Sequence, residues 1–287
     1  MKIGIGLPAT IPGTEGTRIL DWAKKADSGP FSSLSILDRL VYTNYESLTT
    51  LAAVAGVTQR IRLITTVLLA PLRNPALLAK QAASLDALSG GRLTLGLGIG
   101  SREDDYLAAS VPFKKRGKLF DEELETLTKI WSGQPLSEKI GRIGPTPAQP
   151  GGPEILIGGY SPAAIQRVGR WGNGFIAGGR DPKATQQFFQ LAQESWKSAG
   201  RQGKPRLVGC FYYALGSEAI ERAGKYLRNY YVMLGPMVET MINNLPLTID
   251  AIKERIQAYE EIGADEVIIW PCTPDLEQFD QLTELFK

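Results

Sequence analysis

The sequence of 287 residues contains no histidine and only two cysteines, Cys210 and Cys272. Without histidine it cannot form a Ser-His-Asp triad, a Cys-His dyad, an H-E-x-x-H zinc site or a histidine general base. Two cysteines are too few for a thiolate zinc site or a disulfide framework. Any chemistry must therefore depend on a cofactor, on carboxylates, or on the side chains of Tyr, Lys, Arg and Ser.

The chain also lacks a strong net charge and long apolar runs. Lys and Arg number 32 against 30 for Asp and Glu, and no basic stripe accompanies this balance, so nucleic acid is not an expected partner. No run approaches the roughly 18 apolar residues of a membrane span, and the first residues, MKIGIGLPATIPG, lack the apolar core of a signal peptide. We therefore expect no membrane segment and a cytoplasmic location.

Short apolar segments alternate with longer segments of helical periodicity. The expected strands are residues 2–7, 33–38, 61–69, 93–99, 154–158, 174–177, 207–214 and 266–270. The expected helices are residues 17–27, 45–57, 75–88, 117–131, 162–169, 182–199, 218–228, 249–262 and 275–286. Apolar strands that are buried on both faces indicate a parallel sheet covered by helices. Eight such units predict an α/β fold, a (β/α)8 TIM barrel in one domain over residues 1–287, with an open doubly wound sheet as the alternative.

Two connections exceed the usual loop length. Residues 133–153 are rich in Pro and Gly and carry no convincing helix, whereas residues 217–262 are expected to place extra helices between strands 7 and 8.

Active sites of such barrels form at the C-terminal ends of the strands. Strand 2 ends at Asp38, which is either a catalytic carboxylate or a residue that shapes the following loop. The glycines of strand 4 alternate with apolar residues, and a flat ring approaching the backbone would explain them. These glycines are Gly96, Gly98 and Gly100.

The ends of strands 5 and 6 are glycine turns that suit a phosphate group. Gly159, Tyr160 and Ser161 lead into a helix, so that free backbone N–H groups and a hydroxyl meet at a helix N-terminus. Gly178, Gly179 and Arg180 follow the neighbouring strand. The alternative is that both segments are ordinary tight turns.

Two further groups have a structural and a functional interpretation. Cys210 and Cys272 lie in neighbouring strands, where two inert buried thiols are favoured over a redox pair. The acidic run Glu103, Asp104 and Asp105 is expected to be a solvated loop that caps the next helix rather than a metal site.

Three stretches of the sequence resemble the bacterial luciferase-like flavin-dependent oxidoreductases. The most specific is LLAPLRNPALLAKQAASLDALSGGRLTLGLGIG, residues 68–100. ILIGGYSPAAIQRVGRWGNGFIAG, residues 155–178, is nearly as specific, and residues 38–63 support both. The resemblance implies a barrel that binds FMN, or alternatively the deazaflavin F420, at its C-terminal mouth.

The resemblance also implies roles for individual residues. The phosphate-binding backbone would be Gly159, Tyr160 and Ser161, with Gly178 and Gly179 beside it. A non-prolyl cis peptide between Thr66 and Val67 would lie behind the cofactor ring. The strand-4 glycines Gly98 and Gly100 would face the ring. Asp38 would lie near the ring as a proton donor or substrate anchor. Arg39, Arg73 and Arg102 are candidates to bind an anionic substrate or the acidic tail of F420; the alternative for each is a solvated charge at a helix end. Tyr42 and Tyr106 are expected to cover the substrate pocket.

The expected activity is hydride transfer to, or monooxygenation of, a small organic substrate with reduced FMN. An F420-dependent dehydrogenase on the same barrel is the alternative; a non-catalytic flavin-binding protein and a cofactor-free phosphosugar lyase or isomerase are less favoured. The family's ring-side histidines are absent, which argues against light emission but not against hydride transfer, because the flavin itself carries the hydride. The expected partners are the substrate, a flavin reductase or NAD(P)H as reductant, and a second copy of the chain in a homodimer.

Overall fold

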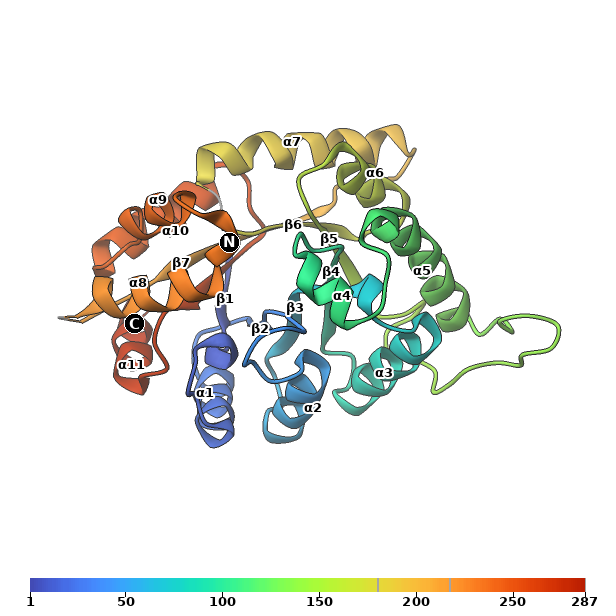
Figure 1. Ribbon diagram of the computed structural model, residues 1–287, viewed down its shortest axis with the longest axis horizontal. Coiled ribbons are helices and arrows are strands. Elements are labelled where there is room, and N and C mark those ends of the chain that lie inside the picture. The colour runs from blue at the N-terminus through green and yellow to red at the C-terminus, as the bar shows by residue number, and fades with distance from the viewer. Residues whose placement is uncertain (180, 217, 287) are drawn as a thin grey trace.

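Eight parallel strands close into a barrel in the computed structural model, which describes residues 1–179, 181–216 and 218–286 (Figure 1). The strands pair in sequence order and β8 pairs with β1. They are β1 (Lys2–Gly6), β2 (Ser33–Ile36), β3 (Arg62–Leu69), β4 (Leu93–Gly98), β5 (Glu154–Gly158), β6 (Gly174–Ala177), β7 (Arg206–Tyr213) and β8 (Glu266–Pro271). This arrangement confirms the predicted barrel and rules out the open sheet.

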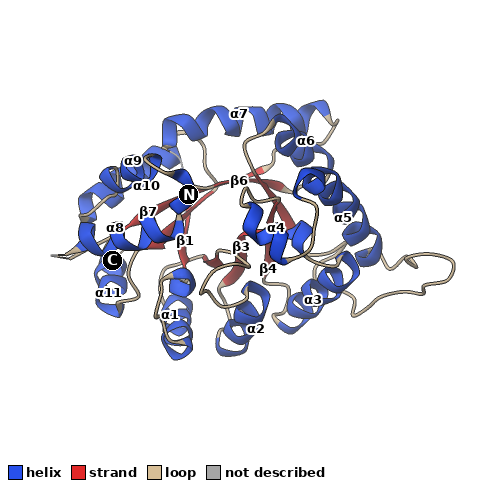
Figure 2. Cartoon of the chain, in the orientation of Figure 1, coloured by secondary structure: helices blue, strands red, loops and turns tan. Residues whose placement is uncertain are grey.

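Helices surround the strands on the outside of the barrel (Figure 2). They are α1 (Gly16–Ser28), α2 (Ser47–Val57), α3 (Pro75–Leu88), α4 (Glu103–Ala108), α5 (Arg116–Trp131), α6 (Pro162–Arg170), α7 (Pro182–Ser198), α8 (Ala219–Tyr230), α9 (Met237–Asn243), α10 (Ile249–Glu261) and α11 (Leu276–Glu284). Since α8, α9 and α10 all lie between β7 and β8, the extra helices predicted there are confirmed. Among the described residues, no helix combines the length and the apolar character needed to cross a bilayer.

Local sequence explains where the helices next to the site begin. The Asn74 side chain accepts a hydrogen bond from the backbone N–H of Leu77, and Pro75 occupies the first turn of α3. Ser161 caps α6 in the same way, again with a proline next to it. A side-chain acceptor satisfies an N–H that has no partner within the helix, and proline needs no such partner, so both sequences fix the helix start.

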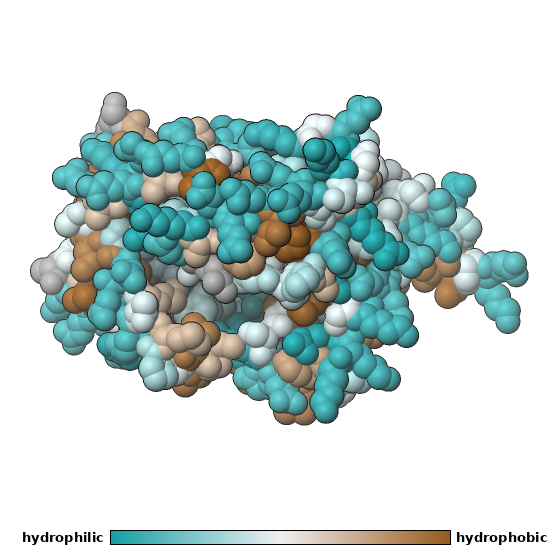
Figure 3. All heavy atoms as spheres, turned by 90° about the horizontal axis from the view of Figure 1, so that it is seen from above, coloured by the Kyte–Doolittle hydropathy of each residue, from teal (hydrophilic) through white to brown (hydrophobic). Residues whose placement is uncertain are grey.

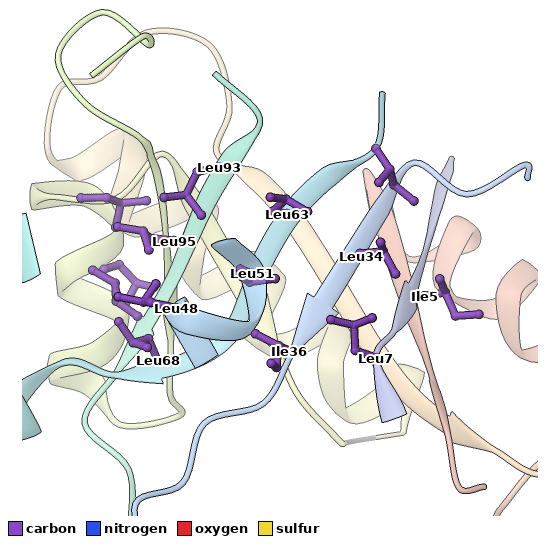
Figure 4. Close-up of a cluster of buried hydrophobic side chains, with 14 of the residues drawn as sticks. Ile5, Leu7, Leu34, Ile36, Leu48, Leu51, Leu63, Leu68, Leu93 and Leu95 are labelled. Atoms are coloured by element: carbon purple, nitrogen blue, oxygen red, sulfur yellow. The ribbon is translucent and has the colours of Figure 1, made fainter. Parts of the chain in front are cut away.

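The apolar core has two layers on the two faces of the sheet. The outer layer lies between the strands and the helices, as Figure 4 shows for strands β1 to β4 and helix α2. There Leu48 and Leu51 of α2 pack with Ile36 and Leu63 of the sheet. The inner layer fills the barrel. It includes Ile64, whose side chain points to the opposite face from that of its neighbour Leu63 because side chains alternate along a strand.

Charged residues close the N-terminal end of the barrel. Arg206 binds the carboxylates of Glu154 and Glu266. Glu266 is 1% exposed and also accepts hydrogen bonds of 2.6 and 2.5 Å from the hydroxyls of Ser32 and Ser33. Because each charge has a partner, this polar layer can lie at the barrel floor without an uncompensated buried charge.

Residues 133–153 form an extended segment without a helix, as expected, and Figure 1 shows it projecting beyond α3 and α5. Its base is held by Gln149, whose backbone and side-chain nitrogens both donate to the buried carboxylate of Asp86, at 2.9 and 2.6 Å. In the turned view of Figure 3 most visible residues are hydrophilic, whereas the projecting segment shows apolar as well as polar residues.

Candidate functional site

A bulge in β3 marks the C-terminal end of the barrel. The pairing of β3 with β4 shifts register between Thr65 and Leu68, and the peptide bond between Thr66 and Val67 is cis. The predicted cis peptide is therefore confirmed. Val67 is partly exposed, and its side chain packs on the inner apolar layer.

The glycines around Val67 make room for this bulge. A Cβ atom on Gly98 would lie 2.7 Å from Cγ2 of Val67, and one on Gly158 would lie 2.7 Å from Cγ1 of the same side chain. A Cβ atom on Gly96 would lie 2.0 Å from the carbonyl oxygen of Thr65. The neighbouring strand therefore already requires glycine at positions 96 and 98, whether or not a ligand is present. That a cofactor ring faces Gly98 and Gly100 stays a prediction. Gly100, which is partly exposed, has a φ of +65°.

The ends of β5 and β6 form two adjoining open turns. Gly159 has a φ of +126°, a conformation that favours glycine. The Tyr160 hydroxyl donates a hydrogen bond of 2.6 Å to the carbonyl oxygen of Gly178 and so joins the two turns. A Cβ atom on Gly178 or Gly179 would have no atom of the described residues within 4 Å. Ser161, at the N-terminus of α6, is exposed, so the backbone here is open to a ligand, whereas Arg180 lies outside the described residues.

Asp38 is buried and tied to three other segments. Arg73 donates to both its carboxylate oxygens, at 2.7 and 3.0 Å. The hydroxyl of Ser47 donates to it at 2.8 Å, and the backbone N–H of Leu69 at 2.9 Å. These contacts give Asp38 the loop-shaping role that the sequence left open, because they join the end of β2 to the end of β3. They also mean that Arg73 is engaged rather than free to bind an anion. A catalytic role for Asp38 stays a prediction.

Arg39 and Asp105 hold the loop after β2 against α4. Nε of Arg39 donates to Asp105 at 2.7 Å, and Nη2 donates to Asp104 at 3.0 Å. The second oxygen of Asp105 accepts from the backbone N–H groups of Leu40 and Val41. Arg39 is therefore engaged within the protein, contrary to the expectation that it binds substrate.

The acidic run at residues 103–105 differs from its prediction. It forms the first turn of α4, and Asp105 is fully buried, so it is not a solvated loop. Within the described ranges, no group of three or more Asp, Glu, Cys or His residues is arranged to hold a metal ion.

Tyr106 is buried rather than exposed at the mouth. It is 1% exposed, and its hydroxyl donates to the carbonyl oxygen of Ile99. Burial raises the pKa of Tyr106 to about 12. The expectation that Tyr106 covers an open pocket is wrong, because the side chain packs inward on the end of β4.

Tyr42 and Arg102, by contrast, both contact Tyr230. The ring centroids of Tyr42 and Tyr230 are 5.1 Å apart, and the guanidinium of Arg102 lies 4.9 Å from the centre of the Tyr230 ring. Arg102 also donates to the carbonyl oxygen of Tyr230. Sequence reasoning missed Tyr230 and the rings around it. The tyrosine-rich run YLRNYY, residues 226–231, was the available signal.

Glu123 on α5 is a second residue that sequence reasoning missed. It is 1% exposed, and neither of its carboxylate oxygens has a hydrogen-bond partner among the described residues. Burial raises its pKa to about 8, an effect that the positive charge of Arg73 opposes. The available signal was its position three residues after Phe120 and four before Leu127, which places it on the apolar face of the helix.

Comparison with known proteins assigns the family. The model of the luciferase-like monooxygenase family matches residues 1–263. This chain belongs to that family, whose members are oxidoreductases. An uncharacterized protein of Mycobacterium tuberculosis is 33% identical over 218 residues, a match that covers 66% of this chain and 74% of that protein. A phthiodiolone/phenolphthiodiolone dimycocerosates ketoreductase of Mycobacterium bovis is 33% identical over 145 residues, covering 46% of this chain and 37% of that enzyme.

Solved structures share the fold of this family member. An F420-dependent secondary alcohol dehydrogenase, solved with an F420-acetone adduct, superposes with a TM-score of 0.81 at 16% identity and covers 99% of this chain and 97% of its own. The oxygenating constituent of 3,6-diketocamphane monooxygenase of Pseudomonas putida, solved with FMN, gives a TM-score of 0.77 at 18% identity, covering 100% and 96%. At such identities the likeness concerns the fold alone.

Proposed function

We propose that this protein is a flavin-type oxidoreductase that binds reduced FMN at the C-terminal mouth of its barrel, with F420 as the alternative cofactor. The observation that carries the proposal is the pair of open glycine turns after β5 and β6, joined by the Tyr160–Gly178 hydrogen bond next to the N-terminus of α6. Backbone N–H groups at a helix N-terminus favour a phosphate group. Membership of an oxidoreductase family and the two cofactor-bound structures of the same fold support it.

The described residues fit such a cofactor. Gly159, Tyr160 and Ser161, together with Gly178 and Gly179, would hold the phosphate. Val67 would lie behind the ring, supported from below by Gly98, and Gly100 would border it. When bound, the cofactor supplies hydride transfer or, as reduced FMN, oxygen activation.

On the substrate side, the charged side chains of the described residues hold strand ends in position and are engaged within the protein, so they offer no unpaired charge to a substrate. Asp38 holds the end of β3 in place through Leu69, and we keep it as the candidate for contact with the ring or with substrate. Tyr42 and Arg102, which both contact Tyr230, are the candidates for contact with substrate. The substrate is a small organic molecule, and the reductant is NAD(P)H or a flavin reductase.

Titration of the apoprotein with FMN and with F420, followed by cofactor fluorescence, tests the proposal. We expect tight binding of one cofactor, and Gly178→Val should weaken it at least tenfold by filling the space above the turn. Gly141→Val, in the projecting segment, is a matched control. A Cβ atom on either glycine would have no described residue within 4 Å, and neither glycine has a positive φ. If neither cofactor binds with a dissociation constant below about 1 mM, the proposal is wrong.

The proposal includes a single domain over residues 1–287 and a homodimer. The two copies would contact each other through α2 and α3. Leu77 and Leu88 of α3 are 54% and 81% exposed, and a contact between two copies through α3 would bury them. Light scattering after gel filtration measures the mass. A monomer at micromolar concentration would contradict this part of the proposal.

A further inference from the structure

Six aromatic rings form one continuous cluster on the β7–β8 side of the mouth. Neighbouring rings in it have centroids 4.9 to 6.3 Å apart, and most pairs meet edge to face. The rings belong to Tyr42, Tyr212, Tyr226, Tyr230, Tyr231 and Trp270. We call this cluster the aromatic wall.

The rings of the aromatic wall are fixed before any ligand binds. The Tyr226 hydroxyl is 2.6 Å from the hydroxyl of Thr10, and the hydroxyls of Tyr212 and Tyr231 are 3.0 Å apart. Trp270 lies so close to Gly6 that a Cβ atom there would be 2.3 Å from the indole ring. Rings held in this way lose little conformational freedom when a ligand packs on them.

Two rings of the aromatic wall remain partly exposed, Tyr42 and Tyr231. Both stand nearly at right angles to the buried ring of Tyr230, at 90° and 83°. Val67, in the bulge of β3, packs against the same apolar cluster. Val67, Tyr42 and Tyr231 therefore all border one apolar cluster. We expect a molecule that binds against Val67 to meet the rings of Tyr42 and Tyr231 as well.

The charged groups described around the aromatic wall are engaged within the protein. Asp38 pairs with Arg73, and Arg39 pairs with Asp105. Arg102 stacks over the wall and donates to a backbone carbonyl. Burial raises the pKa of the Tyr231 phenol to about 12, so its hydroxyl stays neutral at physiological pH. An anion entering here would lose hydration without gaining a free cation among these residues.

We infer that the aromatic wall is the substrate half of the proposed active site and that it takes a neutral molecule with an aromatic ring. An aromatic ring gains from edge-to-face contacts that an aliphatic group of the same size lacks. The inference rests on the proposed function for the identity of the site, but ring binding is measurable without a cofactor.

Equilibrium dialysis of the cofactor-free full-length protein tests the inference with three probes that share one carbon skeleton. They are 2-naphthalenemethanol, which is neutral and aromatic, 2-naphthoate, which is aromatic but anionic, and decahydro-2-naphthalenemethanol, which is neutral and aliphatic. We expect the first to bind at least tenfold more tightly than the naphthoate and about two- to tenfold more tightly than the aliphatic alcohol. Equal or tighter binding of either comparison probe overturns the inference.

Variants locate the binding. Tyr231→Leu should weaken binding of 2-naphthalenemethanol about two- to tenfold, whereas Tyr231→Phe, which keeps the ring, should not. Tyr42→Leu serves if Tyr231→Leu does not fold. Ile140→Ala, an exposed apolar residue in the projecting segment, is the control. Unchanged binding in both leucine variants overturns the inference. If FMN or F420 binds and no probe does, the inference fails and the proposed function stands; if a probe binds and neither cofactor does, the proposed function fails.

Discussion

Arg73 holds both carboxylate oxygens of Asp38, with Nη1 2.7 Å from Oδ2 and Nη2 3.0 Å from Oδ1. Both side chains are largely buried, at 19% and 3% exposed. The pair connects the end of β2 with the turn Ala70–Leu72 that follows β3. It therefore sets the distance between two strand ends at the mouth, and its loss should change both stability and shape there.

Arg73→Gln should lower the free energy of unfolding by about 3 kcal/mol, because it leaves the buried Asp38 carboxylate without its cation. Urea denaturation measures the change. Lys118→Gln, which breaks the exposed Lys118–Glu122 pair, is the control and should cost under about 0.5 kcal/mol. A loss below about 1 kcal/mol for Arg73→Gln would show that the pair does little for the fold.

Gly98→Ala should destabilise the protein by about 1–3 kcal/mol, since the new methyl group meets Cγ2 of Val67. Adding Val67→Ala should recover part of the loss by removing that contact. The four unfolding free energies of the double-mutant cycle measure the coupling. Gly178→Ala, where a Cβ has open space, should leave stability unchanged. Simple additivity of the two substitutions would contradict this explanation of the glycine.

Glu123 should make stability fall as the pH rises. Below pH 4.5 the carboxyl is protonated in both the folded and the unfolded chain. Between pH 4.5 and about 8 the unfolded chain ionises while the folded protein keeps its proton, so the free energy of unfolding decreases over this range and levels off above it. Glu123→Gln should remove this contribution. The difference in unfolding free energy between wild type and variant, measured in urea at several pH values, would be independent of pH if the prediction is wrong.

Both cysteines should resist thiol reagents in the folded protein. Cys210 and Cys272 are free, 4% and 1% exposed, and burial raises the pKa of each thiol. We expect no reaction with Ellman's reagent until denaturant is added, after which two thiols should react. This outcome fits the favoured interpretation of inert thiols. Rapid modification of either one under native conditions would support the redox alternative.

The pattern of apolar residues along the sequence was enough to predict the barrel. Parallel strands buried on both faces appear in a sequence as short apolar runs, and the segments between them have helical periodicity. The pattern did not reveal why Gly98 is a glycine, since the reason is Val67 on another strand. Nor did it reveal that Asp105 is buried, because its partners, Arg39 and two backbone N–H groups, lie more than 60 residues away. Resemblance to a family, not spacing, predicted the cis peptide at Thr66–Val67.

The charged floor of the barrel has a consequence for the opposite end. Arg62, Glu154, Arg206 and Glu266 are each the first residue of a strand, and they contact one another. If one strand slid by a single residue, its charged member would leave the cluster and its side chains would exchange faces. The charged floor thus fixes the register of β3, β5, β7 and β8 relative to one another. The glycine turn after β5 and the rings of Tyr212 and Trp270, on β7 and β8, therefore depend for their position on charges at the opposite end of the barrel.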